Sequence, residues 1–160
     1  MSVLDSLISM IVLIGGIVLL LALQLRTSLI TTGMKMRRAI PAQWILADFL
    51  KLNPSRRKLN QYYLFAEEHV RSLGHKFVGQ VDGAVLHWDN APILDLIIEY
   101  KFPMKQLPKK VRKEDVFQAG LYGLALLESG ASCYSTKLVN IYCLQDKAKK
   151  CFQRKSFKNC

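Results

Sequence analysis

Three charged residues with a fixed spacing are the main chemical signal in this chain. Asp82 lies in one apolar stretch, and Glu99 and Lys101 lie two residues apart in the next. Carboxylates are hard oxygen ligands of the kind that Mg²⁺ and Mn²⁺ prefer, and a neighbouring lysine can orient water or stabilise developing charge. These are the residue types that metal-dependent phosphodiester cleavage needs. The backbone carbonyl of Tyr100 is expected to be a further metal ligand.

Two stretches with strand patterns must position these groups. Residues 76–86 and 93–101 are rich in β-branched and aromatic residues, and side chains two apart on a strand share a face. Glu99 and Lys101 therefore point the same way. The run from 94 to 98 is apolar enough for the middle of a covered sheet, where charges are costly unless paired. A hairpin of the two strands would bring the two carboxylates together.

Three motifs in order carry a resemblance to a known family. A G-x-x-D pattern spans residues 79–82, an E-x-K pattern spans 99–101, and a Q-x-x-x-Y pattern spans 118–122. With these pieces the chain resembles the PD-(D/E)xK nuclease superfamily, and looks most like the RecB-type branch that includes the CRISPR-associated exonucleases. The resemblance covers roughly residues 73–142.

The resemblance implies an α/β fold of the restriction-endonuclease-like kind, with a mixed central sheet flanked by helices. By the same resemblance, Asp82 and Glu99 would bind Mg²⁺ or Mn²⁺ and Lys101 would serve catalysis. Gln118 and Tyr122 would help to place a nucleic-acid strand and steady the site.

The family carries one more metal ligand, an acid or histidine on a helix ahead of the first strand. Here a helix is expected over residues 56–73, after a shorter one over 42–52. Glu67, Glu68 and His69 all lie in the later helix. The choice among them stays open, with Glu67 and His69 flanking its apolar stripe.

Cysteine usage departs from the CRISPR-associated members, which hold an iron–sulfur cluster with one early and three late cysteines. All four cysteines of this chain fall in its last third: Cys133, Cys143, Cys151 and Cys160. An iron–sulfur cluster is therefore not expected. Free thiols are the first interpretation, with thiolate coordination of zinc or a cluster as the alternative.

A helix from about residue 114 to Gly130 should follow the two strands. Gln118 and Tyr122 are four residues apart, so they share one face of it. A separate apolar stripe is expected to pack against the sheet: Phe117, Leu121 and Leu124. A last strand is expected over residues 137–144.

Basic residues dominate the charge, with 23 Lys and Arg against 12 Asp and Glu and a formal net charge of +11. Such an excess suggests a polyanionic partner, either nucleic acid or anionic lipid. A loop over residues 102–113 contributes candidate phosphate contacts: Lys105, Lys109, Lys110 and Arg112. A basic tail over 147–160 adds further charge.

The amino terminus has a different composition. Residues 7–25 form an uncharged apolar run, and about 20 such residues cross a bilayer core as a helix. The basic flank begins at Arg26, on the carboxyl side of the run. The positive-inside rule then places the amino terminus outside and the rest in the cytoplasm. We expect a single-pass membrane protein.

These patterns predict an anchor over residues 1–26, a basic linker over 27–40, a nuclease-like domain over 41–146 and a basic tail over 147–160. The predicted function is a membrane-anchored DNA exonuclease acting on single strands or duplex ends. No ATP-binding motif is present, so a separate helicase would unwind duplex, and CRISPR or repair proteins are candidate partners.

The alternative is a catalytically inactive nuclease-fold module that binds nucleic acid or assembles a complex at the membrane. In a third interpretation, the basic surface binds anionic lipid alone.

Overall fold

The computed structural model describes residues 3–51 and 61–147. Its contacts divide the chain into two compact units, one ending at Arg37 and the other starting at Arg38. The first is a single helix, α1 (Val3–Arg38). The second holds the following elements: β1 (Ile40–Pro41), α2 (Leu46–Lys51), β2 (Tyr62–Ser72), β3 (Phe77–Asp89), β4 (Ala91–Lys101), α3 (Lys113–Glu128), β5 (Lys137–Tyr142) and a 3₁₀ turn, η2 (Gln145–Lys147).

Helix α1 is long and apolar enough to cross a membrane, and the segment that meets this criterion is Leu7–Arg38. Its 36 residues correspond to about 54 Å at a rise of 1.5 Å per residue, well beyond a bilayer core of about 30 Å. The helix continues through residues 27–38, where the sequence suggested a linker. The basic end of the helix therefore extends past the length that a bilayer core needs.

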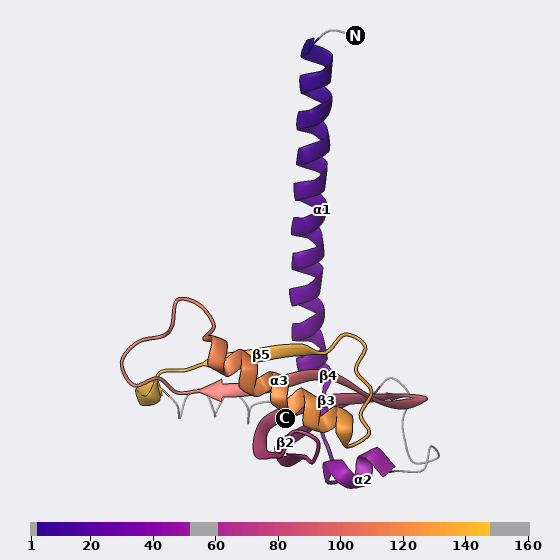
Figure 1. Cartoon of the computed structure of the whole chain (residues 1–160), viewed down its shortest axis with the longest axis vertical. Helices are drawn as coiled ribbons and strands as arrows, with labels where there is room; N and C mark the ends of the chain where they lie inside the picture. The colour runs from indigo at the N-terminus through magenta and orange to yellow at the C-terminus, as the bar shows by residue number, and fades with distance from the viewer. Residues whose placement is uncertain (1–2, 52–60, 148–160) are drawn as a thin grey trace. The chain divides into compact units, whose positions relative to one another are not determined.

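The second unit is built on a five-stranded mixed sheet with the order β1-β2-β3-β4-β5. The pairs β2–β3 and β3–β4 are antiparallel, whereas β1–β2 and β4–β5 are parallel. Helix α3 makes the connection between the parallel strands β4 and β5 (Figure 1). This arrangement confirms the predicted α/β class with a mixed sheet and helices, preceded by an apolar helix.

The helix predicted over residues 56–73 is wrong for its described part, because residues 62–72 form strand β2. Backbone pairing with β3 runs from Tyr62↔His87 to Ser72↔Phe77. The apolar residues that suggested a helical stripe are aromatic or β-branched at Tyr63 and Val70, and such residues favour strands. Gly74, expected to end a helix, lies in the hairpin turn instead. Residues 56–60 lie outside the described residues.

The first predicted helix is shorter than expected and begins at Leu46 rather than Ala42. The backbone amide of Ala42 donates to the carbonyl of Leu64 at 2.9 Å, so the preceding segment extends the β1–β2 pairing. Phe49 of α2 is fully buried and its ring lies 5.1 Å from that of Phe65. Strand pairing thus extends to Ala42, the first residue of the predicted helix, and the helix starts four residues later.

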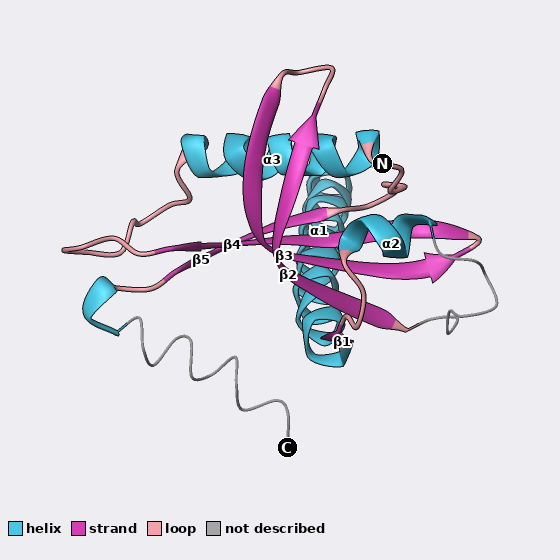
Figure 2. Cartoon of the chain, turned by 90° about the horizontal axis from the view of Figure 1, so that it is seen from below, coloured by secondary structure: helices cyan, strands magenta, loops and turns pink. Residues whose placement is uncertain are grey.

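Helix α3 packs on the sheet through a face other than the predicted apolar stripe. Its buried residues are Ala119, Tyr122, Ala125 and Leu126. Phe117 of the predicted stripe is 69% exposed, so the prediction is wrong for this residue, whereas Leu121 and Leu124 are half-buried. Small residues explain the phase of the helix, since an added Cβ on Gly123 would lie only 3.1 Å from Ile97 Cδ1. In Figure 2 the turn end of the β2–β3 hairpin crosses α3.

The last predicted strand is present but ends at Tyr142. Cys143, just beyond it, is buried and disulfide-bonded, so the expectation of a free thiol is wrong there. Cys133 is a free and exposed cysteine. Cys151, Cys160 and all of the basic tail after Lys147 lie outside the described residues.

Candidate functional site

The site begins where strand β3 separates from β4. Their pairing starts at Gly83↔Ile98, and Asp82 is the next residue of β3 beyond it. Beyond this pair, the Asp82 side chain replaces a backbone acceptor, because its Oδ2 accepts a hydrogen bond of 2.7 Å from the backbone amide of Tyr100. An acidic side chain is thereby held beside the E-x-K segment.

Glu99 is the most buried charged residue of the site, with 2% of its surface exposed. Its Oε2 lies 3.4 Å from Lys101 Nζ. Burial raises the pKa of Glu99, and the negative charge of Asp82 raises it further, although Lys101 partly offsets both effects. Among the described residues, Glu99 Oε1 is buried with no hydrogen-bond partner.

Lys101 links the sheet to helix α3. Its Nζ donates a hydrogen bond of 2.6 Å to Gln118 Oε1 and lies 3.9 Å from Asp115 Oδ1. The ammonium therefore has a polar neighbour on each side, with Glu99 on its own strand and two residues on the helix. A long flexible side chain is ordered in this way at one end of the sheet.

Gln118 is itself held by Tyr122 and, through it, by strand β3. The Gln118 amide nitrogen donates to the Tyr122 hydroxyl at 2.7 Å. The Tyr122 ring lies over Gly79, where an added Cβ would be only 2.5 Å from Tyr122 Cε1. Gly79 is thus required by close contact with the ring, and the tyrosine in turn fixes the glutamine that holds Lys101.

All three sequence motifs therefore meet in space. Gly79 and Asp82 come from β3, Glu99 and Lys101 from β4, and Gln118 with Tyr122 from α3. In this set the Lys101 ammonium lies beside Glu99 and Asp115, and the Asp82 carboxylate lies near Glu99. Asp95 of the same strand lies outside this set and pairs with His87.

The residues suit a hard cation in part. Asp82 and Glu99 are oxygen donors, and the buried Oε1 of Glu99 with no partner is the kind of atom that a cation would satisfy. Within residues 3–51 and 61–147, however, no group of three or more His, Cys, Asp and Glu could hold a metal ion. From the described residues, a further ligand would be a backbone, amide or hydroxyl oxygen, with water as the other source.

The structure does not bring the expected upstream ligand to the site. Glu67 and His69 lie on strand β2 and are exposed, and neither joins the two carboxylates in a metal-binding group. The backbone of Glu67 has φ of 57°, and its carbonyl accepts a hydrogen bond from Gln80 Nε2. The predicted upstream ligand depended on a helix packed over the sheet, but these residues form strand β2 instead.

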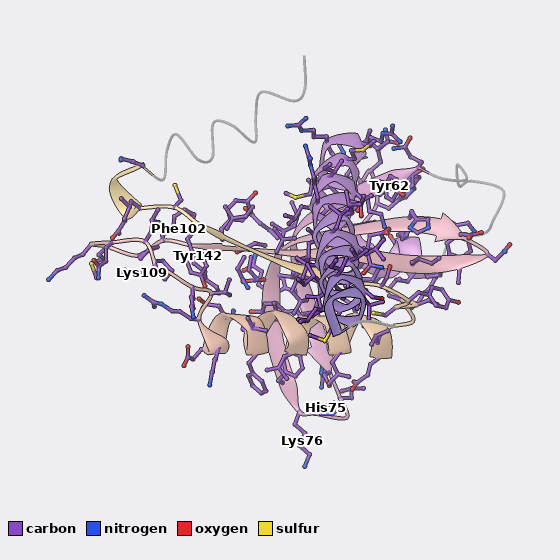
Figure 3. The ribbon with its side chains drawn as sticks, turned by 90° about the horizontal axis from the view of Figure 1, so that it is seen from above. Tyr62, His75, Lys76, Phe102, Lys109 and Tyr142 are labelled. Carbon is purple, nitrogen blue, oxygen red and sulfur yellow. The ribbon has the colours of Figure 1, made fainter. Side chains whose placement is uncertain are left out.

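A small cavity of about 190 Å³ opens beside Lys101. Phe102, Pro103 and Arg112 of the loop between β4 and α3 line it, together with Asp115 of α3 and Tyr142 of β5. The Tyr142 hydroxyl donates to Asp115 Oδ2 at 2.5 Å and accepts from the backbone amide of Arg112 at 3.2 Å. Figure 3 shows Phe102 and Tyr142 together, away from the hairpin turn marked by His75.

The basic loop contributes unequally to this cavity. Arg112 lines it, whereas Lys105, Lys109 and Lys110 are exposed along the loop. Tyr122, expected to contact nucleic acid, is buried with 7% exposure, so its direct role is to hold Gln118. Gln118 is half-buried beneath the lysine.

Sequence reasoning missed one polar residue of the site, Asn140 on β5. It is the register partner of Glu99 in the parallel β4–β5 pair. Its Oδ1 is buried with no hydrogen-bond partner in the described part of the chain. An asparagine between Val139 and Ile141 in a strand was the available signal, because such residues are depleted from strands.

Comparisons of the chain with family models, with curated protein sequences and with solved structures found no match. The function must therefore be argued from the residues themselves.

Proposed function

We propose that this chain is a membrane-anchored, Mg²⁺- or Mn²⁺-dependent DNA nuclease of the PD-(D/E)xK superfamily, with a restriction-endonuclease-like domain. One observation carries the proposal. The Lys101 ammonium is held between Glu99 and Gln118, and a second carboxylate, Asp82, lies near Glu99 at the point where two strands separate. A merely structural ion pair would not need a half-buried second carboxylate beside the buried Glu99, because the two negative charges repel each other.

In this proposal Asp82, Glu99 and the backbone carbonyl of Tyr100 hold the metal. A bound divalent cation supplies Lewis-acid polarisation of the phosphate and lowers the pKa of water. Phosphodiester hydrolysis adds the oxygen of one water to phosphorus and breaks the bond to a sugar oxygen, which leaves with a proton.

Lys101 then has a defined task. Its ammonium donates hydrogen bonds to the attacking water or to the phosphate oxygens, whose negative charge grows in the transition state. Gln118 orients the amine, and Tyr122 orients Gln118. Fixing a flexible lysine in advance removes an entropy cost from the reaction.

The cavity beside Lys101 supports an end-processing enzyme. Its volume of about 190 Å³ is below the about 300–1,000 Å³ typical of small-molecule sites, so it suits one base or phosphate better than a duplex. Phe102 and Tyr142 supply aromatic surface for stacking, and Arg112 supplies positive charge. The exposed lysines of the loop would bind neighbouring phosphates without sequence preference.

The long helix α1 supports the membrane anchor. Its carboxyl-terminal part carries Arg26, Lys35, Arg37 and Arg38. By the positive-inside rule, this end and the second unit lie in the cytoplasm and the amino terminus lies outside. Helicase, repair or CRISPR proteins remain proposed partners, since unwinding would have to come from another chain.

The test is a nuclease assay on the full chain in detergent micelles. Labelled linear DNA, single-stranded and duplex, is incubated with Mn²⁺, with Mg²⁺ and with EDTA. We expect metal-dependent degradation, and Lys101→Ala should slow it by roughly a hundredfold or more because transition-state charge is no longer stabilised. Circular single-stranded DNA should survive if the enzyme needs an end.

Lys76→Ala is the matched control, because Lys76 lies in the hairpin turn, outside the set of contacts that surrounds Lys101. Equal cutting by wild type and Lys101→Ala would refute the assignment of the catalytic lysine. DNA that is bound and never cut would instead favour the inactive binding module. The absence of a third His, Cys, Asp or Glu ligand in the described residues is the observation that keeps this second candidate.

A further inference from the structure

Two buried oxygens on neighbouring strands have no hydrogen-bond donor in the described part of the chain. They are Oε1 of Glu99 on β4 and Oδ1 of Asn140 on β5. A buried acceptor with no donor is rare in folded proteins, since the lost hydration is not replaced. Two such atoms close together call for a common explanation.

The sheet places these two side chains next to each other. Glu99 and Asn140 are register partners in a parallel pair, so they stand at the same level of adjacent strands about 4.8 Å apart. Their side chains point to the same face. Asp82 lies on the other side of Glu99 and is close enough for its negative charge to raise the pKa of Glu99. Oxygen-bearing side chains thus follow one another on three consecutive strands, β3, β4 and β5.

The side chains of Asp82, Glu99 and Asn140 bring more hydrogen-bond acceptor oxygens to this place than the described residues around them bring donors. Lys101 is the one cation beside them in the described residues, and its Nζ contacts Glu99 through Oε2, not through Oε1. Its shortest contact is to Gln118 on α3. Glu99 Oε1 and Asn140 Oδ1 therefore have no positively charged partner among the described residues.

We propose that Asn140 is a further ligand of the divalent metal, donating its side-chain oxygen beside Glu99. This inference rests on the proposed function for the identity of the metal, but not for the position of the oxygens. An amide oxygen is a hard ligand of the type that Mg²⁺, Mn²⁺ and Ca²⁺ accept. It brings the side-chain donors to three where His, Cys, Asp and Glu alone supply two.

The test measures metal binding by the full chain in detergent micelles, separately from DNA cutting. Thermal unfolding is followed by the fluorescence of Trp44 and Trp88 in EDTA and over a Mn²⁺ titration, since a ligand that binds the folded state raises the melting temperature. Asn140→Leu keeps the approximate size of the side chain and removes its oxygen.

Two opposite effects are expected in Asn140→Leu. In EDTA the variant should be at least as stable as the wild type, because a buried acceptor with no partner has been removed. Its affinity for Mn²⁺ should fall by about tenfold or more, as for the loss of groups that support a metal site. Asn140→Asp should do the reverse, with lower stability in EDTA and tighter Mn²⁺ binding, since it adds a third carboxylate.

Thr136→Val is the matched control on the same edge of the sheet. Thr136 donates to the carbonyl of Leu94 at 2.7 Å, just before β5. Its loss should lower stability in EDTA and leave the Mn²⁺ affinity unchanged, so loosening of β5 alone does not imitate a lost ligand.

Two results would overturn the inference: the wild type could fail to bind Mn²⁺, or Asn140→Leu could bind it with unchanged affinity. If unchanged affinity came with lower stability in EDTA, the amide of Asn140 would instead donate its nitrogen to Glu99. DNA cutting distinguishes the two proposals. If the wild type cuts DNA and Asn140→Leu binds Mn²⁺ with unchanged affinity, Asn140 is not a ligand but the chain is still a nuclease. If this variant binds Mn²⁺ more weakly and the wild type does not cut DNA, the ligand proposal stands and the nuclease proposal fails.

Discussion

The contact between Gly79 and Tyr122 allows a sharp test of how the site is held. In Gly79→Ala the new Cβ would lie 2.5 Å from Tyr122 Cε1, closer than carbon atoms can approach. The ring cannot move freely, because Tyr122 is buried and its hydroxyl accepts a hydrogen bond from Gln118. The substitution must therefore displace a core aromatic and, through Gln118, the amine of Lys101.

The expected cost is the difference between two effects. Overpacking of a core costs about 1–3 kcal/mol. Replacing glycine by alanine in a strand returns roughly 0.5–1 kcal/mol of backbone entropy. The middle of the two ranges gives a net loss of about 1 kcal/mol, or roughly 3–5 °C in melting temperature for a domain of this size. Tryptophan fluorescence during thermal unfolding of the full chain in micelles would measure it.

The same substitution at Gly120 is the control, and its expected sign is opposite. An added Cβ there meets nothing within 4 Å, and Gly120 lies inside helix α3. Gly120→Ala should stabilise the chain by about 0.5–1 kcal/mol through helix propensity.

A double variant isolates the contact itself. Tyr122→Leu removes the ring, so Gly79→Ala should cost little or nothing in that background, and a coupling of about 1 kcal/mol or more is expected. Destabilisation by Gly79→Ala that is equal with and without the Tyr122 ring would refute the packing of this ring on β3.

Three further predictions follow from buried and exposed groups. The raised pKa of Glu99 means that its contribution to stability is present below the unfolded pKa of about 4.3 and is lost as pH rises through the folded pKa. In EDTA, the unfolding free energy of Glu99→Gln should therefore fall less with rising pH than that of the wild type, and the variant should be the more stable protein at neutral pH. Denaturant unfolding at a series of pH values measures both. Hydrogen bonds from His75, then Ser72, lower the pKa of Glu128, so its contribution is lost as pH falls through the folded pKa, and Glu128→Gln should remove this acid sensitivity in the same series. On helix α3, Leu126→Ala should cost about 2–5 kcal/mol of unfolding free energy and Phe117→Ser less than about 0.5, and the reverse order would refute the observed phase of the helix.

The β3–β4 hairpin and the shared face of Gln118 and Tyr122 could be predicted because they depend on local periodicity. Alternation along a strand decides that Glu99 and Lys101 point the same way, and a spacing of four decides the helix pair. Both effects act within one element, so they are visible in the chain without knowledge of its partners.

The errors arose where a second element decides the outcome. Residues 62–72 carry apolar side chains at spacings that fit a helix, yet ten backbone pairings with β3 outweigh that local pattern. Helix α3 has two apolar faces, and the smaller side chains of Ala119, Gly123 and Ala125 let it approach the sheet more closely than Phe117 would. Neither preference is visible before the sheet surface is known.

The same distinction explains why Asn140 escaped notice while Lys101 did not. Lys101 is recognisable from its spacing to Glu99, two residues away in sequence. The significance of Asn140 depends on a parallel register between strands some forty residues apart, which α3 connects. A polar residue in an apolar strand indicates only that some partner must exist. Here the register identifies Glu99 as its neighbour, and the two buried oxygens without donors are the observation on which the proposal of a bound cation rests.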